Sequence, residues 1–477
     1  MKKFKLVKNT FSLLANRLVQ SITTFLLTAS ISRTLGAYAL GQYLLAFTYY
    51  YIFVSIISQG LKTLFTRELS RNPEEMPVYL VSGTLLQFVL SIVGYVALVV
   101  VVFVLPYNAD TSMVCYILGL TIIPFALSNI TEAIFQAQEK MNLIAISTIP
   151  VYILRLLVML WCIHLKYGIN YLAGIFVVSE ALIFIIQWIL ITQTVKPKWH
   201  IDQDFIWKVL KSARIFLAID AVGIVSTRLD ILIISLLGSE LMVGLYGAIE
   251  QLQQPFMMIV NSLSLAVFPS MTKAVDKTKE NQRQVTENIS EILMGISLPF
   301  IVGIFFFGGD LLKFIYQDSN FNQAILALHI SSLALILYPF VRIFNYLLLA
   351  YGLEKFNLIE TIATSFITGV SGVILISQYQ LLGAALMEVL GTITSFVILG
   401  YAVYSRILTL TLWKIMFRPL IITLGTAFVF IILEKVTLGL ILNIIISVFS
   451  YSLLAGSFMI QSLGGVNATW KKVFNKV

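Results

Sequence analysis

Long apolar runs recur along the whole of this sequence, and they constrain its fold more than any other feature. An α-helix needs about 20 apolar residues to cross the hydrocarbon core of a bilayer, which is the length of these runs. Helices satisfy their backbone polar groups internally, so a chain with many such runs is expected to cross the membrane repeatedly as helices. Hydrophobic residues make up 59% of the chain and charged residues only 12%, which leaves too few polar side chains for a water-facing surface. We therefore predict an all-α, polytopic membrane protein.

The apolar runs divide into fourteen predicted membrane-spanning helices. Their expected ranges are 11–34, 41–60, 77–104, 112–136, 142–164, 171–194, 214–236, 242–268, 290–307, 323–350, 356–378, 382–404, 415–433 and 438–461. An even number of spans places both termini on the same side of the membrane.

The distribution of basic residues indicates which side that is. Most of the 32 Lys and Arg residues fall in the two termini and in alternate loops, whereas the opposite loops hold only Arg33, Lys166, Lys313 and Lys435. Cytoplasmic segments carry an excess of Lys and Arg. The pattern predicts a protein of the cell (inner) membrane with both termini in the cytoplasm.

Several functional classes are disfavoured by the same sequence. The net charge of +9 is spread over short loops and forms no basic domain for nucleic acid. Cys115 and Cys162 both lie in apolar runs, which argues against a disulfide framework or a metal site. We find no GxxxxGK[ST], GxSxG or HExxH motif, and no loop is long enough for a soluble catalytic domain. We expect a protein that is not an enzyme and that needs no cofactor.

An internal repeat points to the architecture. Leu35-Gly36 is followed by a short turn and by Gly41-x-Tyr43, and Leu237-Gly238 is followed in the same way by Gly244-Leu245-Tyr246. Six predicted helices separate the two copies, so both halves enter the membrane in the same direction, as in transporters built from parallel repeats. We predict two parallel six-helix lobes, 1–200 and 201–408, followed by helices 13 and 14 and a cytoplasmic tail in 409–477.

Further short motifs carry a resemblance to a known family. They are Gln136-Ala137-Gln138-Glu139-Lys140, Leu349-Ala350-Tyr351-Gly352-Leu353-Glu354-Lys355 and Leu382-Gly383-Ala384-Ala385, together with the two repeat turns and Asp230. By the order and spacing of these motifs, the whole chain resembles a polysaccharide flippase. The superfamily of such flippases also holds multidrug-and-toxin exporters and the lipid II flippase. The resemblance implies a MATE-like fold, and it implies that helices 13 and 14 form a groove for a polyprenyl tail. The chain departs from the family by lacking a proline near the start of helix 7.

Polar and charged residues inside the predicted spans are the candidate site. A charged side chain at mid-bilayer costs about 2.5–3.5 kcal/mol on insertion scales, so it should face a cavity or a partner. The candidates for substrate binding are Arg17, Arg155, Arg228, Arg342, Asn345 and Gln254, and those for coupling to an ion are Asp220, Asp230, Glu250 and Glu180. Two alternatives stay open, namely that Arg155 forms a structural ion pair with Glu180 and that Arg17 extends to the cytoplasmic edge.

These features predict a flippase that moves polyprenyl-diphosphate-linked oligosaccharide by alternating access, with arginines holding the diphosphate. The alternatives on the same fold are a cation-coupled multidrug exporter and a lipid II flippase. From another class comes a membrane-embedded polysaccharide polymerase or ligase. The expected partners are the lipid-linked substrate and membrane lipid, with a polysaccharide polymerase as a further candidate and a monomer as the favoured state.

Overall fold

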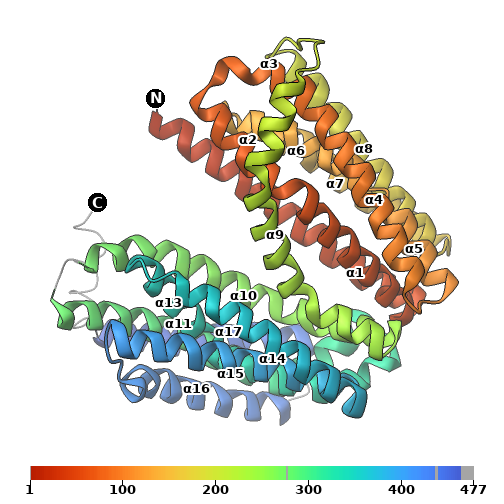
Figure 1. Cartoon of the computed structure of the whole chain (residues 1–477). Helices are drawn as coiled ribbons and strands as arrows, with labels where there is room; N and C mark the ends of the chain where they lie inside the picture. The colour runs from red at the N-terminus through yellow and green to blue at the C-terminus, as the bar shows by residue number, and fades with distance from the viewer. Residues whose placement is uncertain (1, 276–277, 436–438, 463–477) are drawn as a thin grey trace. The chain divides into compact units, whose positions relative to one another are not determined.

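The computed structural model describes residues 2–275, 278–435 and 439–462, and every regular element in those ranges is a helix (Figure 1). The predicted all-α class is confirmed. By its internal contacts the chain divides into two units, Met1–Gly247 with Tyr316–Asp318, and Ala248–Ile315 with Ser319–Val477. The contact-based division does not test the lobes that the repeat predicts. The ranges 1–200, 201–408 and 409–477 therefore stay a prediction.

The first unit contains the helices up to the start of α10. They are α1 (Lys2–Val54), the π-helical turn η1 (Ser55–Gln59), α2 (Gly60–Arg71), η2 (Pro73–Glu75), α3 (Met76–Val78), η3 (Tyr79–Gly83), α4 (Thr84–Val104), α5 (Ala109–Gly119), α6 (Ile122–Ala137), α7 (Met141–His164), α8 (Ile169–Thr192), α9 (Gln203–Leu237) and the first turns of α10 (Glu240–Ala274). Helix α1 packs on α5 and α7, while α2, α4 and α8 pack around α6.

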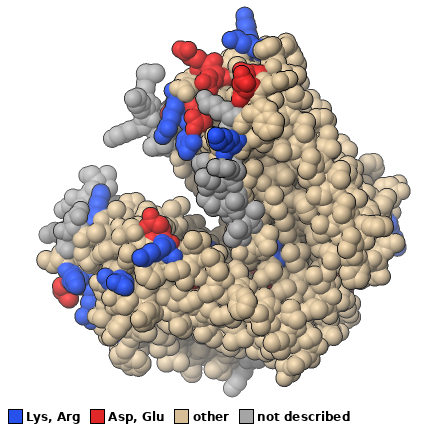
Figure 2. All heavy atoms as spheres, viewed as in Figure 1, with Lys and Arg blue, Asp and Glu red and all other residues tan. Residues whose placement is uncertain are grey.

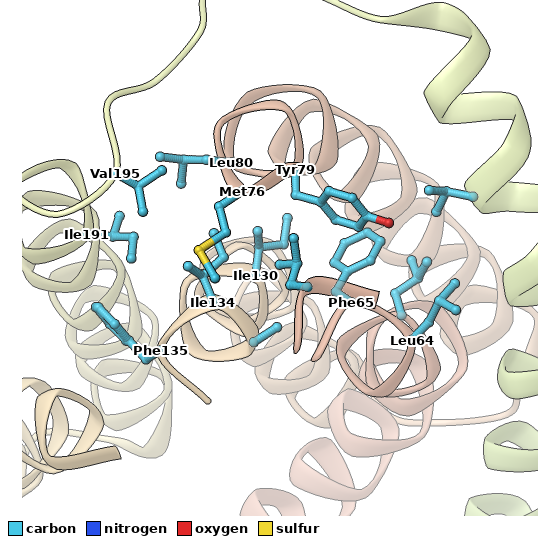
Figure 3. Close-up of a cluster of buried hydrophobic side chains, with 14 of the residues drawn as sticks. Leu64, Phe65, Met76, Tyr79, Leu80, Ile130, Ile134, Phe135, Ile191 and Val195 are labelled. Carbon is cyan, nitrogen blue, oxygen red and sulfur yellow. The ribbon is translucent and has the colours of Figure 1, made fainter. Parts of the chain in front are cut away.

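A cluster of buried apolar side chains joins α2, α3, α6 and α8 in the first unit (Figure 3). Phe65 of α2 meets the ring of Tyr79 edge-on, with ring centroids 5.1 Å apart. Ile134 of α6 and Ile191 of α8 are fully buried in the same cluster. This packing fixes α2 against α6, and those two helices carry one of the polar pockets described below.

The second unit contains the rest of α10 and all later helices, apart from the short segment Tyr316–Asp318. They are α11 (Lys279–Tyr316), η4 (Ser319–Gln323), α12 (Ala324–Ser332), α13 (Ala334–Ala350), α14 (Lys355–Tyr379), α15 (Leu381–Arg406), α16 (Leu412–Lys435) and α17 (Leu440–Ser462). Helix α15 packs against α12, α13 and α14. Phe256 of α10 stacks on Phe300 of α11 at 5.0 Å, which joins the two long helices.

Ten of the described helices are long and apolar enough to cross a membrane, or eleven if the bent pair around Leu333 counts as one span. The chain is therefore a multi-pass membrane protein, but the predicted count of fourteen is not confirmed. Two predicted spans, 11–34 and 41–60, lie on one continuous helical stretch, Asn9–Arg71. Helix α9 carries Asp220, Arg228 and Asp230 within its apolar stretch, and the described apolar part of α17 is short. Among the described residues in the view of Figure 2, charged side chains gather in a few clusters and most of the surface is uncharged.

The glycines of the repeat motif have structural roles at a kink and at a close backbone contact. Gly36 adopts φ +86°, which kinks α1 in place of the predicted turn, and the carboxylate of Asp318 accepts a hydrogen bond of 2.9 Å from the next backbone N–H, that of Ala37. A Cβ atom on Gly41 would lie 1.7 Å from the carbonyl oxygen of Glu240, and one on Gly244 would lie 2.1 Å from that of Ala37. The two copies of the repeat therefore pack directly on each other, backbone against backbone.

Candidate functional site

Four arginines lie within predicted spans, and the structure gives them different surroundings. Arg17, Arg155 and Arg228 belong to the first unit and Arg342 to the second. Each arginine carries a positive charge that is costly in the low-dielectric membrane unless a partner or a cavity compensates it. What each one contacts indicates whether its charge is already balanced within the protein.

Arg155 of α7 is compensated. Its Nη1 lies 2.7 Å from Oε1 of Glu180 on α8, with exposed side-chain fractions of only 7% and 5% for the two residues. The guanidinium also donates to Ser179 at 3.3 Å and lies over the ring of Phe176 at 4.2 Å and that of Tyr152 at 4.9 Å. This geometry favours the structural ion pair for Arg155, and it occupies Glu180, one of the predicted ion-coupling residues.

Arg228 of α9 is half-buried and lies 5.8 Å from the centre of the Tyr51 ring. It makes no ion pair with any residue whose side chain the structure describes. Asp230, two residues on, accepts hydrogen bonds from Tyr246 at 3.3 Å and from the N–H of Ile231 at 2.7 Å. The side chain of Asp220, another ion-coupling candidate on this helix, lies outside the described residues.

Arg342 of α13 has only neutral partners in the described second unit. Its Nε donates to the hydroxyl of Tyr338 at 3.1 Å, and that hydroxyl donates in turn to Oδ1 of Asn261 on α10 at 3.1 Å. The guanidinium also lies 5.2 Å from the centre of the Tyr338 ring. A phenol and an amide thus orient the arginine without cancelling its charge.

The other polar candidates of the second unit lie near this chain of hydrogen bonds in sequence. Asn345 follows Arg342 by three residues and therefore shares its helical face, and its backbone carbonyl oxygen accepts a hydrogen bond from the side-chain amide of Asn357 at 3.2 Å. Gln254 is exposed and precedes Asn261 by seven residues, which places both on one face of α10. Glu250 is half-buried one turn before Gln254. The structure brings Arg342, Tyr338 and Asn261 into contact, and places Gln254 and Asn345 on the same helical faces.

Arg17 of α1 is exposed and has no hydrogen bond or ion pair with a described side chain or backbone group. Further along α1, Thr23 and Thr24 line a hollow of about 30 Å³ together with Tyr43 and Arg155. That volume is enough for about one water molecule. The hollow is too small for a sugar in this conformation.

A polar pocket between α2 and α6 was missed by the sequence analysis. It has a volume of about 410 Å³ and is lined by Gln59, Lys62, Thr63, Thr66, Arg67, Ser70 and Gln136. Lys62 is ion-paired with Glu132 of α6, and Arg67 with Glu68 at 2.7 Å. The signal is the polar face of 59–70, whose Lys62 and Arg67 are counted in the charge distribution only as cytoplasmic loop residues. The π-helical turn η1 ends at Gln59, and such turns occur often at functional sites.

Comparison with known proteins gives a family and a fold. A sequence model of the family described as "Polysaccharide biosynthesis protein" matches residues 6–275. No curated protein matches the chain. Among solved structures, the lipid II flippase MurJ in an inward closed conformation aligns with a TM-score of 0.74 at 17% identity, over 95% of this chain and 98% of that one.

Two other solved structures are similar over most of the chain. A multidrug resistance MATE family transporter in an inward-facing conformation aligns with a TM-score of 0.68 at 14% identity, covering 81% of this chain and 94% of that one. A transporter of the MOP superfamily from Pyrococcus furiosus aligns with a TM-score of 0.58 at 14% identity, covering 84% and 95%. At these identities the likeness establishes the fold, and the predicted MATE-like fold class is confirmed.

Proposed function

This chain belongs to the polysaccharide biosynthesis protein family, and from that premise we propose that it is a flippase for lipid-linked sugar. It moves polyprenyl-diphosphate-linked oligosaccharide from the cytoplasmic to the outer leaflet by alternating access. The name of the MurJ structure describes a flippase for another lipid-linked precursor, and this supports the same class of cargo here.

The observation that carries the proposal is the environment of Arg342. A guanidinium binds the paired oxygens of a diphosphate well, because it is planar, always charged and presents several donors. Arg342 is oriented by Tyr338 and Asn261 but keeps its charge unbalanced among the described residues. Within the first unit, Arg17 and Arg228 likewise make no ion pair with a described side chain. Arg155 contributes to the packing of α7 on α8 instead.

Export of a diphosphate is favoured by an inside-negative membrane potential, by about 2.3 kcal/mol per charge for each 100 mV. The proposed reaction therefore needs no coupling ion. Asp220, Asp230 and Glu250 remain the candidates if one is used, whereas Glu180 is held by Arg155.

The proposal places the protein in the cell (inner) membrane as a monomer with both termini in the cytoplasm. The polyprenyl tail stays in lipid, where α16 and α17 form a groove for it. A polysaccharide polymerase that takes the exported repeat unit is the candidate partner.

The rival functions differ in what they require. A cation-coupled exporter of this superfamily is expected to carry a carboxylate in its first helix, and residues 11–34 contain no Asp or Glu. A lipid II flippase would share the fold and differ in being essential. A polymerase or ligase would need a sizeable external loop for its chemistry, and the predicted external loops are short.

Deletion of the gene tests the proposal. We expect a lipid-linked oligosaccharide to accumulate on the cytoplasmic leaflet, and we expect complementation by the wild type and by Arg406→Ala, a control at the exposed end of α15. Arg342→Ala should fail to complement at equal protein level. Increased drug sensitivity without accumulation of lipid-linked sugar would instead support the exporter.

A further inference from the structure

A groove of about 590 Å³ runs along the first unit between α5, α7 and α8. Its walls are almost wholly apolar and include Leu154 of α7 and Val178 of α8, whose exposed fractions are 51% and 68%. In a membrane-spanning unit, apolar walls exposed to this degree face lipid and not water. The volume lies in the range of ordinary ligand pockets.

The length of the groove matches one leaflet of the bilayer. Along α8 its lining extends from Asn170 to Leu182. At 1.5 Å per helical residue these twelve steps span about 18 Å, and half of the hydrocarbon core is about 15 Å. The groove therefore begins at the turn between α7 and α8 and ends near the middle of the membrane, on the side that the charge distribution predicts to be external.

Cationic and donor groups stand at the open end. Lys166 lies exposed in the α7–α8 turn, with a φ of +61°. The rings of Tyr167 and Tyr171 pack 4.9 Å apart across the start of α8, and Tyr171 also lines the groove. Gly168 gives α8 no side-chain cap, and of the first N–H groups only that of Tyr171 is bonded within the described chain, to the carbonyl oxygen of Gly168 at 3.1 Å. The N–H groups of Ile169 and Asn170 stand at the positive end of the helix. A phosphate group has the complementary charge for this end.

The floor of the groove carries no unbalanced charge that an anion could neutralise. It contains Arg155 and Ser179, and the charge of Arg155 is already balanced by Glu180 at 2.7 Å. A ligand over this floor must therefore be apolar, and its presence would keep water away from the ion pair. The groove thus combines a positively charged end at Lys166 with an apolar channel about as long as one leaflet is thick.

We propose that this groove is a lipid site, which holds one acyl chain of an anionic phospholipid of the outer leaflet with its phosphate at Lys166 and the first turn of α8. The surrounding bilayer is as apolar as the groove, so the chain alone gives little preference for this place. Selectivity must come from the headgroup. The site does not depend on the proposed cargo, but it rests on the proposed orientation, in which the α7–α8 turn is external.

Gly174 offers a clean test because it lines the groove and a Cβ atom there would meet nothing within 4 Å. Gly174→Phe should fill the groove without displacing its walls. Ile189→Phe is the control, since Ile189 lies on the same helix, is 54% exposed and does not line the groove. Purified protein is mixed with dipalmitoyl phosphatidylglycerol or phosphatidylethanolamine, and retained lipids are counted by native mass spectrometry.

The wild type and Ile189→Phe should retain one phosphatidylglycerol, and Gly174→Phe should reduce that retention at least fivefold with an unchanged melting temperature. Lys166→Gln should remove the preference for phosphatidylglycerol over phosphatidylethanolamine. Equal retention by Gly174→Phe and the wild type, or an equal loss in Ile189→Phe, would overturn the proposal. So would selective retention of a polyprenyl phosphate over phosphatidylglycerol, because the groove would then hold the tail of a polyprenyl lipid.

Discussion

Arg155 in the first unit and Arg342 in the second both place a guanidinium within a membrane-spanning helix, yet their surroundings are opposite. Arg155 is buried against a carboxylate and two aromatic rings. Arg342 is half-buried and held by a phenol that is itself bonded to an amide. A guanidinium within the membrane is costly unless it has a partner. Glu180 balances the charge of Arg155, whereas in the proposed mechanism the diphosphate of the cargo balances that of Arg342.

The largest expected effect concerns stability in the first unit. Arg155→Met leaves the carboxylate of Glu180 buried without its partner, and breaking a buried ion pair in this way costs about 3–5 kcal/mol. We expect a marked fall in the melting temperature of the purified protein. The double variant Arg155→Met/Glu180→Met should recover most of the loss, because it removes both charges. A single variant as stable as the wild type would mean that the pair does not hold α7 to α8.

The second effect concerns transport and the second unit. Arg342→Met should leave the melting temperature nearly unchanged, since no carboxylate among the described residues loses a partner. A hydrogen bond to a charged group contributes about 1.5–3 kcal/mol, so flipping should fall about tenfold or more. The measurement is the initial rate of transfer of lipid-linked oligosaccharide in proteoliposomes. Arg342→Lys should be intermediate, because lysine keeps the charge but lacks the planar fork.

The smallest effect tests how Arg342 is oriented. Tyr338→Phe keeps the aromatic ring but removes the hydroxyl that links Arg342 to Asn261. The variant loses both hydrogen bonds of that hydroxyl, but Arg342 keeps its charge and can still reach the cargo. A loss of orientation worth about 1 kcal/mol corresponds to about a fivefold reduction in the same assay. Tyr346→Phe, on the same helix, is the matched control, since its ring packs on Phe268 and takes no part in this link. Equal losses in the two variants would show that the hydroxyl of Tyr338 has no special role.

Much of the fold followed from the length of the apolar runs. In the described chain the predicted spans lie in helical segments, because a helix satisfies its own backbone polar groups in lipid. Two spans are divided, however, 112–136 between α5 and α6 and 323–350 between η4, α12 and α13. The number of spans was harder, since a kink at Gly36 leaves α1 continuous where the sequence predicted a turn. The repeat was visible as Gly41 and Gly244, but their mutual contact was not, because it depends on packing between distant segments.

The sequence predicted which residue types make up the candidate site, but not which of those residues contact one another. The pairing of Arg155 with Glu180 was one of two alternatives that the sequence offered, and only the packing of α7 on α8 favours it. Tyr338 and Asn261 lie on separate helices, so their contact could not be read from spacing within either one. Lys62 was interpreted as a topology signal because its partner Glu132 is on another helix, and the pocket beside it was missed for that reason.

The central claim is that the uncompensated arginine of the second unit, and not the compensated one of the first, holds the diphosphate. The most direct measurement is the dissociation constant of purified protein for a polyprenyl diphosphate, compared between Arg342→Met and Arg155→Met/Glu180→Met at equal amounts of folded protein. The account predicts at least tenfold weaker binding for Arg342→Met and a change of less than about twofold for the double variant. Unchanged binding by Arg342→Met, or an equal loss in the double variant, would contradict it.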